Sequence, residues 1–301
     1  MNNANITRNF HECDIYGNIN MSISTVLLNQ AIQTNIQQAL QEDIGDGDIT
    51  ALLTPEHEQA TATIISRETM VLAGQPWVNA LIHSYDPSIQ ILWLKNDGEI
   101  VQANEAFFKL SGSARSLLTV ERPALNFIQT LSAVATKTAE YVKQLDGLNT
   151  RLLDTRKTLP GLRIAQKYAV AIGGGQNHRL GLFDAFLIKE NHIMAAGGIA
   201  QAIHQARQIA PQKPIEVEVE TWDELNLALD AKADIVMLDN FSQQQMIDAV
   251  QYVNGRCKLE ASGNITIENL REIATTGVDY ISMGVLTKDV KAIDLSMRFN
   301  A

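Results

Sequence analysis

Cysteine is scarce in this chain, and long apolar stretches are absent. Its 301 residues include only two cysteines, Cys13 and Cys257, too few for a disulfide framework or a cysteine-based metal cluster. No apolar run is long enough to cross a bilayer, and the first residues lack the basic-then-apolar layout of a signal peptide. These absences argue against a secreted or membrane-embedded protein, so we expect a location in the reducing cytoplasm.

Basic residues are also fewer than acidic ones. The chain has 24 Lys and Arg against 34 Asp and Glu, which gives a net charge of −10 at pH 7. An acidic protein repels nucleic acid and anionic membrane surfaces, so neither is expected as a partner. Apolar residues make up 46% of the chain, enough for a large core. Against this acidic background, any local concentration of Arg and Lys is informative.

The first part of the chain predicts a small domain of mixed α/β character. Residues 1–24 are rich in Asn and lack periodicity, so we expect a poorly ordered leader, with Met21 as an alternative natural start. Residues 25–125 read as an α/β sandwich domain, to which residues 287–301 are expected to return. Its expected helices are residues 26–40 and 75–82, and its expected strands are residues 60–66, 69–73, 89–94, 99–103 and 107–112.

Two further local patterns lie near this domain. The acidic loop at residues 42–50 resembles a calcium loop, but Thr54 stands where an EF-hand requires its closing Glu. A turn in which Asp side chains cap the backbone is the better interpretation. Pro123 is expected in the first turn of a long helix that ends at Gly147, with Arg122 before it held in an extended conformation.

Residues 126–286 predict a barrel domain, because strands and helices alternate there and such alternation indicates a parallel sheet. Seven strands are expected, at residues 151–155, 168–172, 184–189, 215–220, 234–238, 257–261 and 280–283. Helices are expected between most of them, at residues 199–209, 222–231, 243–253 and 267–275. Polar residues follow the strands, at the edge where α/β barrels carry their active sites.

The residues at these strand ends divide by chemistry. The first three ends supply cations that would form a strong anion site: Arg156, Lys157, His178, Arg179 and Lys189. The next two supply Glu218 and Asp239, which suit ribose hydroxyls or a phosphate-bound Mg²⁺. The last two supply Ser262, Gly263 and Gly284, whose backbone N–H groups suit a phosphate. A single surface cation would mean little, but five at successive strand ends indicate a substrate with a sugar, phosphates and an anionic partner.

Three acids alternate with valines in the fourth strand, at Glu216, Glu218 and Glu220. Such a row of acids is often solvent-exposed. In a barrel strand, however, one face is interior, so at least one of these acids is expected to work in the site.

Several motifs closely resemble those of the quinolinate phosphoribosyltransferase family. The most specific are Asp154-Thr155-Arg156-Lys157-Thr158 and Asn177-His178-Arg179. Others stand in the same order: Glu121-Arg122-Pro123, Lys189-Glu190-Asn191-His192, Glu216-Val217-Glu218, Asp239-Asn240 and Ser262-Gly263-Asn264. The resemblance covers residues 26–299. It implies an α/β fold with an N-terminal α/β sandwich and an open seven-stranded α/β barrel, in a homodimer whose further assembly stays open.

The resemblance also implies an activity and a set of site residues. The enzyme would transfer phosphoribosyl from phosphoribosyl pyrophosphate to quinolinate with decarboxylation, for NAD biosynthesis. Quinolinate would be held by Arg122 of the partner subunit and by Arg156, His178, Arg179 and Lys189, with Thr155 also at the substrate. Lys157 and Lys189 would face phosphoribosyl pyrophosphate, and Ser262, Gly263 and Gly284 its 5′-phosphate. Glu218 and Asp239 would meet the ribose hydroxyls, near a Mg²⁺ held mainly by phosphates. Lys157, Glu218 and Asp239 are the expected catalytic residues.

Three alternatives compete with this interpretation. The nearest is a related phosphoribosyltransferase of the same fold that acts on another acid, such as nicotinate, or a molybdenum-utilisation paralogue, although the many cations favour a dicarboxylate. A non-catalytic sensor of a phosphorylated metabolite has no need to keep residues for both the leaving group and the nucleophile, as this chain does with Glu218, Asp239, Arg156 and Lys157. A barrel lyase or isomerase lacks support, because no isolated acid–base pair or Schiff-base lysine points to it.

Overall fold

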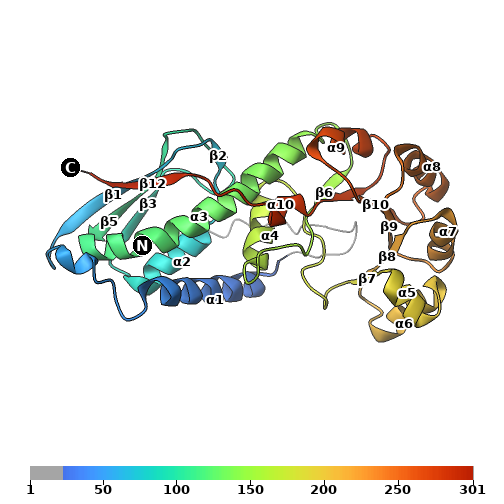
Figure 1. Ribbon diagram of the computed structural model, residues 1–301, viewed down its shortest axis with the longest axis horizontal. Coiled ribbons are helices and arrows are strands. Elements are labelled where there is room, and N and C mark those ends of the chain that lie inside the picture. The colour runs from blue at the N-terminus through green and yellow to red at the C-terminus, as the bar shows by residue number, and fades with distance from the viewer. Residues whose placement is uncertain (1–22, 301) are drawn as a thin grey trace, which may run out of the picture. The chain divides into compact units, whose positions relative to one another are not determined.

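The chain forms two compact units, which are described separately (Figure 1). The computed structural model describes residues 23–300, so the expectations for residues 1–22, including a start at Met21, lie outside the described residues. The barrel unit comprises Tyr141–Arg156 and Gly175–Gly284. The sheet unit comprises Ile23–Glu140, Lys157–Gly174 and residues 285–300.

The barrel unit contains a parallel sheet of six strands, which confirms the expected α/β barrel class. The strands are β6 (Arg151–Leu153), β7 (Phe186–Ile188), β8 (Ile215–Val219), β9 (Ile235–Asp239), β10 (Lys258–Ser262) and β11 (Tyr280–Ser282). Their order is β6-β11-β10-β9-β8-β7, and every neighbouring pair is parallel. Beside β6, in the place of a seventh strand, Leu153 forms a single parallel bridge with Gln176.

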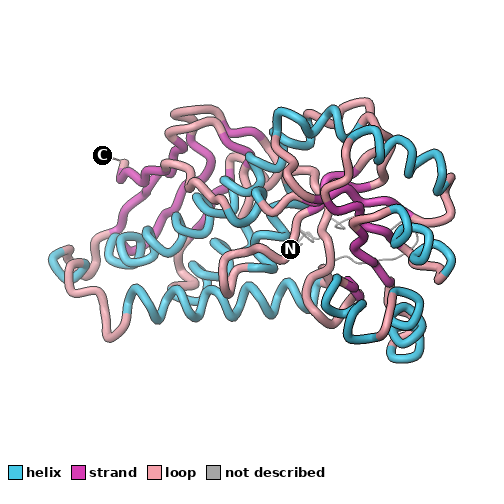
Figure 2. Tube along the Cα trace, turned by 45° about the vertical axis from the view of Figure 1, so that its right-hand side comes forward, coloured by secondary structure: helices cyan, strands magenta, loops and turns pink. Residues whose placement is uncertain are grey.

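Helices follow the strands of the barrel unit, along their outer side in both views (Figures 1 and 2). They are α5 (Glu190–Ala196), α6 (Ile199–Ile209), α7 (Trp222–Asp230), α8 (Gln243–Val253) and α9 (Ile267–Ala274). Thr221 and Ser242 begin α7 and α8 with capping boxes, in which side chain and backbone satisfy each other's free donors. The inward faces are apolar, as with Leu225 and Ala228 of α7.

The sheet unit is built on an antiparallel sheet with the order β12-β1-β5-β3. Its strands are β1 (Gln59–Ser66), β3 (Gln90–Trp93), β5 (Ala106–Ser113) and β12 (Leu295–Phe299), with a separate pair of β2 (Met70–Val71) and β4 (Ile100–Val101). Its helices are α1 (Thr25–Ile44), η1 (Ala51–Leu53), α2 (Gln75–Tyr85), α3 (Ala114–Lys143, as far as Glu140), α4 (Arg163–Ile172) and α10 (Val285–Lys288). Because β12 pairs with β1, the end of the described chain completes a sheet begun near its start.

A buried polar network joins the helices of the sheet unit. The indole N–H of Trp77 donates to Oδ1 of Asn35 at 3.1 Å, and the Trp77 and Tyr168 rings meet edge to face. The Tyr168 hydroxyl donates to Oδ2 of Asp97 at 2.5 Å, and this carboxyl also accepts the backbone N–H of Gly74 at 3.0 Å. Burial nevertheless raises the pKa of Asp97 to about 6, because the interior disfavours its charged form.

Two predicted elements are wrong, both in the sheet unit. Residues 168–172 form the end of α4 rather than a strand, since Ala165, Tyr168 and Ala169 recur at helical spacing and are buried. Pro123 lies inside α3 instead of opening it, so Arg122 is helical rather than extended. The apolar stripe of α3 begins upstream of the proline, and α3 starts directly after β5.

The acidic loop behaves as a turn, as predicted. Oδ1 of Asp48 accepts the backbone N–H groups of Thr50 and Ala51 at 3.0 and 2.9 Å. Within residues 23–300, no helix has the length and apolar content needed to span a bilayer.

Candidate functional site

The carboxyl ends of the six parallel strands meet at one edge of the barrel unit, here called the mouth. Most of the predicted site residues lie at or just after these ends: Thr155, Arg156, Lys189, Glu218, Asp239, Ser262, Gly263 and Gly284. In a parallel sheet this edge gathers the loops that follow the strands. The structure therefore brings these eight residues to one edge of one unit.

Three cations line an open hollow of about 560 Å³ in the barrel unit: Arg156, Arg179 and Lys189. The rest of its lining is largely apolar, with Ala185 and Ile188 among the contributors. Lys189 forms an ion pair with Glu218, and Nη1 of Arg179 lies 3.4 Å from the Ala185 carbonyl oxygen. The hollow thus combines cationic groups with an apolar wall, which suits a flat organic anion.

Asp154 fastens the segment that carries His178 and Arg179 to the end of β6. Its fully buried carboxylate accepts Nδ2–H of Asn177 at 2.7 Å and the backbone N–H of His178 at 2.9 Å. The backbone adds two bonds, from Gln176 to the Leu152 carbonyl and from Asp154 to the Gln176 carbonyl. A single buried carboxylate therefore sets the position of two predicted substrate residues.

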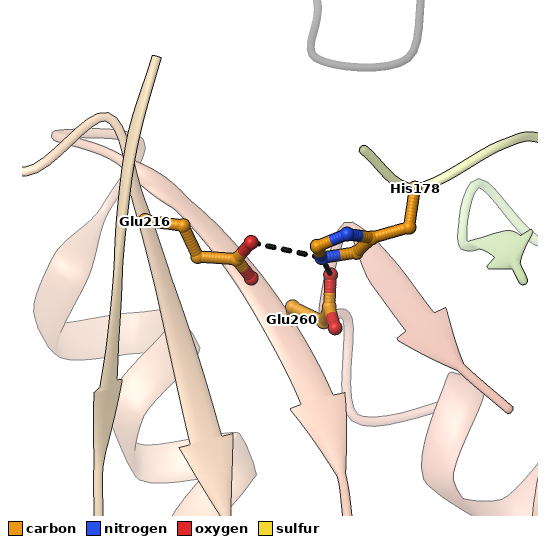
Figure 3. A group of neighbouring side chains, drawn as sticks. All are labelled: His178, Glu216 and Glu260. Atoms are coloured by element: carbon orange, nitrogen blue, oxygen red, sulfur yellow. Dashed lines mark ion pairs between the residues drawn. The ribbon is translucent and has the colours of Figure 1, made fainter. Parts of the chain in front are cut away.

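His178 points into the barrel interior, toward two carboxyl groups (Figure 3). Its Nε2 lies 2.8 Å from Oε2 of Glu216 and 3.5 Å from Oε2 of Glu260. The ligand atoms of these three buried side chains lie within 4.8 Å of one another, close enough to hold a metal ion. From the sequence, His178 was expected at the mouth with the other cations, after a strand at residues 168–172 that is instead part of α4, and no role was expected for Glu260.

The ends of β9 and β10 approach each other closely. Nδ2–H of Asn264 donates to Oδ1 of Asn240 at 3.0 Å, and the backbone N–H of Asn240 donates to the Ser262 carbonyl at 3.3 Å. Gly263 has φ +91°, and a Cβ there would lie 2.5 Å from Oδ1 of Asn240. Only glycine fits this turn without strain. Gly263 is solvent-exposed and has no side chain, so its backbone is accessible beside Asp239.

Two predicted site residues, Arg122 and Lys157, belong to the sheet unit. Arg122 is exposed on α3. Lys157 directly follows Arg156, and its side chain is exposed while its carbonyl accepts the Thr287 hydroxyl at 2.8 Å. Both side chains are accessible to an anion.

Two family models match, and together they cover most of the chain. The C-terminal domain of quinolinate phosphoribosyl transferase matches residues 134–298, and its N-terminal domain matches residues 48–132.

Curated proteins and solved structures agree with these matches. The probable nicotinate-nucleotide pyrophosphorylase (carboxylating) of Bacillus subtilis (strain 168) is 42% identical over 257 residues, 85% of this chain and 89% of that protein. A chloroplastic protein of Oryza sativa subsp. japonica with the same enzyme name is 41% identical, over 88% of this chain and 76% of its own. The structure of the nicotinate-nucleotide pyrophosphorylase from Francisella tularensis superposes with a TM-score of 0.88 at 52% identity, covering 90% of this chain and 97% of that one.

Proposed function

This chain belongs to the quinolinate phosphoribosyl transferase family, and we propose that it converts quinolinate and phosphoribosyl pyrophosphate into nicotinate mononucleotide, pyrophosphate and CO₂. The reaction would serve de novo NAD biosynthesis. The observation that carries the proposal is the hollow beside β7 in the barrel unit, which Arg156, Arg179 and Lys189 line together with an apolar wall. Quinolinate is a flat ring with two carboxylates, so it matches both properties.

The cations of the hollow would bind and orient quinolinate. Hydrogen bonds to charged groups contribute about 1.5–3 kcal/mol each, so several of them hold a small dianion firmly. The planar guanidinium groups of Arg156 and Arg179 can each contact a carboxylate through two N–H groups, which fixes the ring direction. Correct orientation aims the ring nitrogen at C1 of the ribose, the atom it must attack.

The other side of the mouth would hold phosphoribosyl pyrophosphate. The Ser262 hydroxyl and the open backbone at Gly263 and Gly284 suit its 5′-phosphate. Glu218 and Asp239 suit the ribose hydroxyls, and their negative charge favours the cationic sugar formed as pyrophosphate leaves. Lys157, exposed next to Arg156, would face the phosphates.

Magnesium fits this site, because Glu218 and Asp239 offer carboxylate oxygens, the donor type that Mg²⁺ prefers. We propose that phosphates hold most of the ion's coordination sphere, with the two acids nearby. When bound, Mg²⁺ offsets the negative charge of the departing pyrophosphate.

The reaction then balances without an organic cofactor. The ring nitrogen forms a bond to ribose C1 as the bond from C1 to pyrophosphate breaks. The nitrogen is now positively charged, so the ring can accept the electron pair left at C2 when the adjacent carboxylate departs as CO₂. A proton then adds at C2. The residues of the hollow would hold the second carboxylate throughout.

We further propose a homodimer in which Arg122 acts in the partner's site, as the family resemblance implies. The exposure of Arg122 on α3 supports this role. Arg122→Ala and Lys157→Ala subunits, each inactive alone, are expected to regain activity when mixed, since one of the two sites in a mixed dimer is intact. Failure of the mixture to regain activity would exclude shared sites.

A direct assay tests the proposed function. The purified protein is incubated with phosphoribosyl pyrophosphate, Mg²⁺ and quinolinate labelled at the C2 carboxylate, and labelled CO₂ and nicotinate mononucleotide are measured. Nicotinate serves as the control substrate. The proposal would be refuted if the protein converted nicotinate but released no labelled CO₂ from quinolinate. The expected cytoplasmic location stays a prediction, because rice and tobacco relatives are named chloroplastic and mitochondrial.

A further inference from the structure

The loop at residues 157–162 carries Lys157, the residue that the proposed function places at the phosphates of phosphoribosyl pyrophosphate. This loop precedes α4 in the sheet unit, and the Lys157 side chain is exposed. A long side chain on a loop binds an anion well only when its backbone is fixed beforehand, because ordering the loop during binding costs free energy. The contacts of the backbone around Lys157 therefore bear on how well this site binds phosphates.

Gln166, in the first turn of α4, reaches back to this loop from the interior of the sheet unit. It is fully buried, at 0% exposure, so both ends of its side-chain amide need a partner. Oε1 accepts the backbone N–H of Leu159 at 2.7 Å, and Nε2–H donates to the Thr287 carbonyl at 2.8 Å. One buried amide thus joins the loop to α10.

Thr287, in α10, completes the connection to Lys157. Its hydroxyl donates to the Lys157 carbonyl at 2.8 Å, and its own carbonyl accepts the Gln166 amide. Thr287 is also fully buried, and α10 lies beside α4 (Figure 1). Hydrogen bonds therefore hold the carbonyl of Lys157 and the N–H of Leu159, one on each side of Thr158. We call Gln166 and Thr287 the loop clamp.

Other side chains of the sheet unit fix α10 and the far end of the loop. The ammonium group of Lys137, on α3, donates to the carbonyls of Val285 and Asp289, which lie at the two ends of α10. Nδ2–H of Asn35, on α1, donates to the Gly161 carbonyl at 3.0 Å. The loop clamp is therefore itself held by helices of the sheet unit.

We propose that Gln166 and Thr287 are positioning residues, which fix the backbone beside Lys157 so that its ammonium group is already aimed at the phosphates of phosphoribosyl pyrophosphate. This inference rests on the proposed function. Both residues are fully buried, so they act through Lys157 and not by contact with the substrate.

Thr287→Val tests the loop clamp with little change of shape, because a methyl group replaces the hydroxyl. The dissociation constant for phosphoribosyl pyrophosphate, measured by calorimetry with Mg²⁺ and without quinolinate, is expected to rise roughly ten-fold, equivalent to about 1.4 kcal/mol. Thr287→Ser keeps the hydroxyl and is expected to restore most of the affinity. The KM for quinolinate is expected to change much less, because the cations of the hollow lie in the barrel unit.

A double substitution shows whether the effect passes through Lys157. In Lys157→Ala the group to be positioned is gone, so adding Thr287→Val is expected to change the dissociation constant less than roughly two-fold. A role in stability alone predicts the same loss of affinity in both backgrounds. Thr275→Val is the matched control, because the exposed Thr275 also donates its hydroxyl to a backbone carbonyl, that of Glu272 at 2.6 Å. This control is expected to bind like the wild type.

Hydrogen exchange measures the loop clamp without any ligand. In Gln166→Leu, which nearly keeps the side-chain volume, the Leu159 amide loses its acceptor and is expected to exchange roughly ten-fold faster or more. Unchanged exchange at Leu159, or wild-type affinity in Thr287→Val, would overturn the proposal. An equal loss of affinity with and without the Lys157 side chain would also overturn it. If the expected results hold but the wild-type protein releases no CO₂ from quinolinate, the proposed function alone is refuted.

Discussion

A substitution at Asp154 tests whether its buried carboxylate positions the segment of His178 and Arg179 against the end of β6. In Asp154→Asn, the remaining oxygen can still accept the His178 N–H. The new amide group, however, meets the amide of Asn177, donor against donor. One charge-assisted bond is lost and a buried donor is left unpaired, so we expect a loss of about 2–4 kcal/mol in the stability of this segment.

Hydrogen exchange and kinetics measure this effect. The amides of residues 177–179 are expected to exchange faster by a factor of roughly 30 or more, which corresponds to about 2 kcal/mol. The KM for quinolinate should rise in the same variant, because Arg179 is no longer held in position. Asp146→Asn, an exposed change upstream of β6, is the control. If Asp154→Asn exchanges like the wild type, the carboxylate does not position the segment.

Three further predictions follow from the described contacts. Arg156→Ala is expected to lower kcat/KM for quinolinate roughly 100-fold or more, because two charge-assisted bonds to the substrate are lost. The free energy of unfolding is expected to stay the same. Near-normal activity would show that Arg156 does not act in the site. The pKa of Asp97 is raised from 3.8 to about 6, so the native state retains a proton that the unfolded chain releases in this range. The free energy of unfolding should therefore fall by about 3 kcal/mol in all as pH rises from about 3 to 7, with most of the fall between pH 4 and 6, and urea titrations should show this dependence in the wild type but not in Asp97→Asn. Gly263→Ala is expected to raise the KM for phosphoribosyl pyrophosphate roughly ten-fold, because its Cβ would displace Asn240; an unchanged KM would separate this turn from the phosphate.

Sequence patterns predict the outer helices of the barrel unit well. Residues 199–209 and 243–253 form helices with the expected bounds. Their signals are local, since a capping residue opens α8 and an apolar stripe continues at helical spacing. The parallel arrangement of the strands was also predicted, because alternating strands and helices indicate a parallel sheet.

Patterns fail where the signal is short or depends on distant pairing. The apolar run at residues 168–172 fits a strand as well as a buried helix, and the tertiary structure makes it part of α4. Glu260 reads from the sequence only as an acid within a strand. Its meeting with Glu216 depends on the register of β8, β9 and β10, which no local pattern reveals.

The position of His178 illustrates the same limit. This residue was expected to follow a strand at residues 168–172, which is instead the end of α4, and the direction of its ring was not predicted. The ring direction follows from the bond to Asp154, 24 residues away in the sequence, and from the backbone N–H of the neighbouring Arg179. Motifs therefore identified which residues gather, while the structure shows which of them face the interior.

The pairing of β12 with β1 has a consequence for biosynthesis. Met297 stands opposite Ile64, so this edge of the antiparallel sheet stays open on the ribosome until the whole barrel unit has been translated. Until then β1 exposes unpaired N–H and C=O groups, a surface open to association with other nascent chains. Shortening the chain before Leu295 would make that transient exposure permanent.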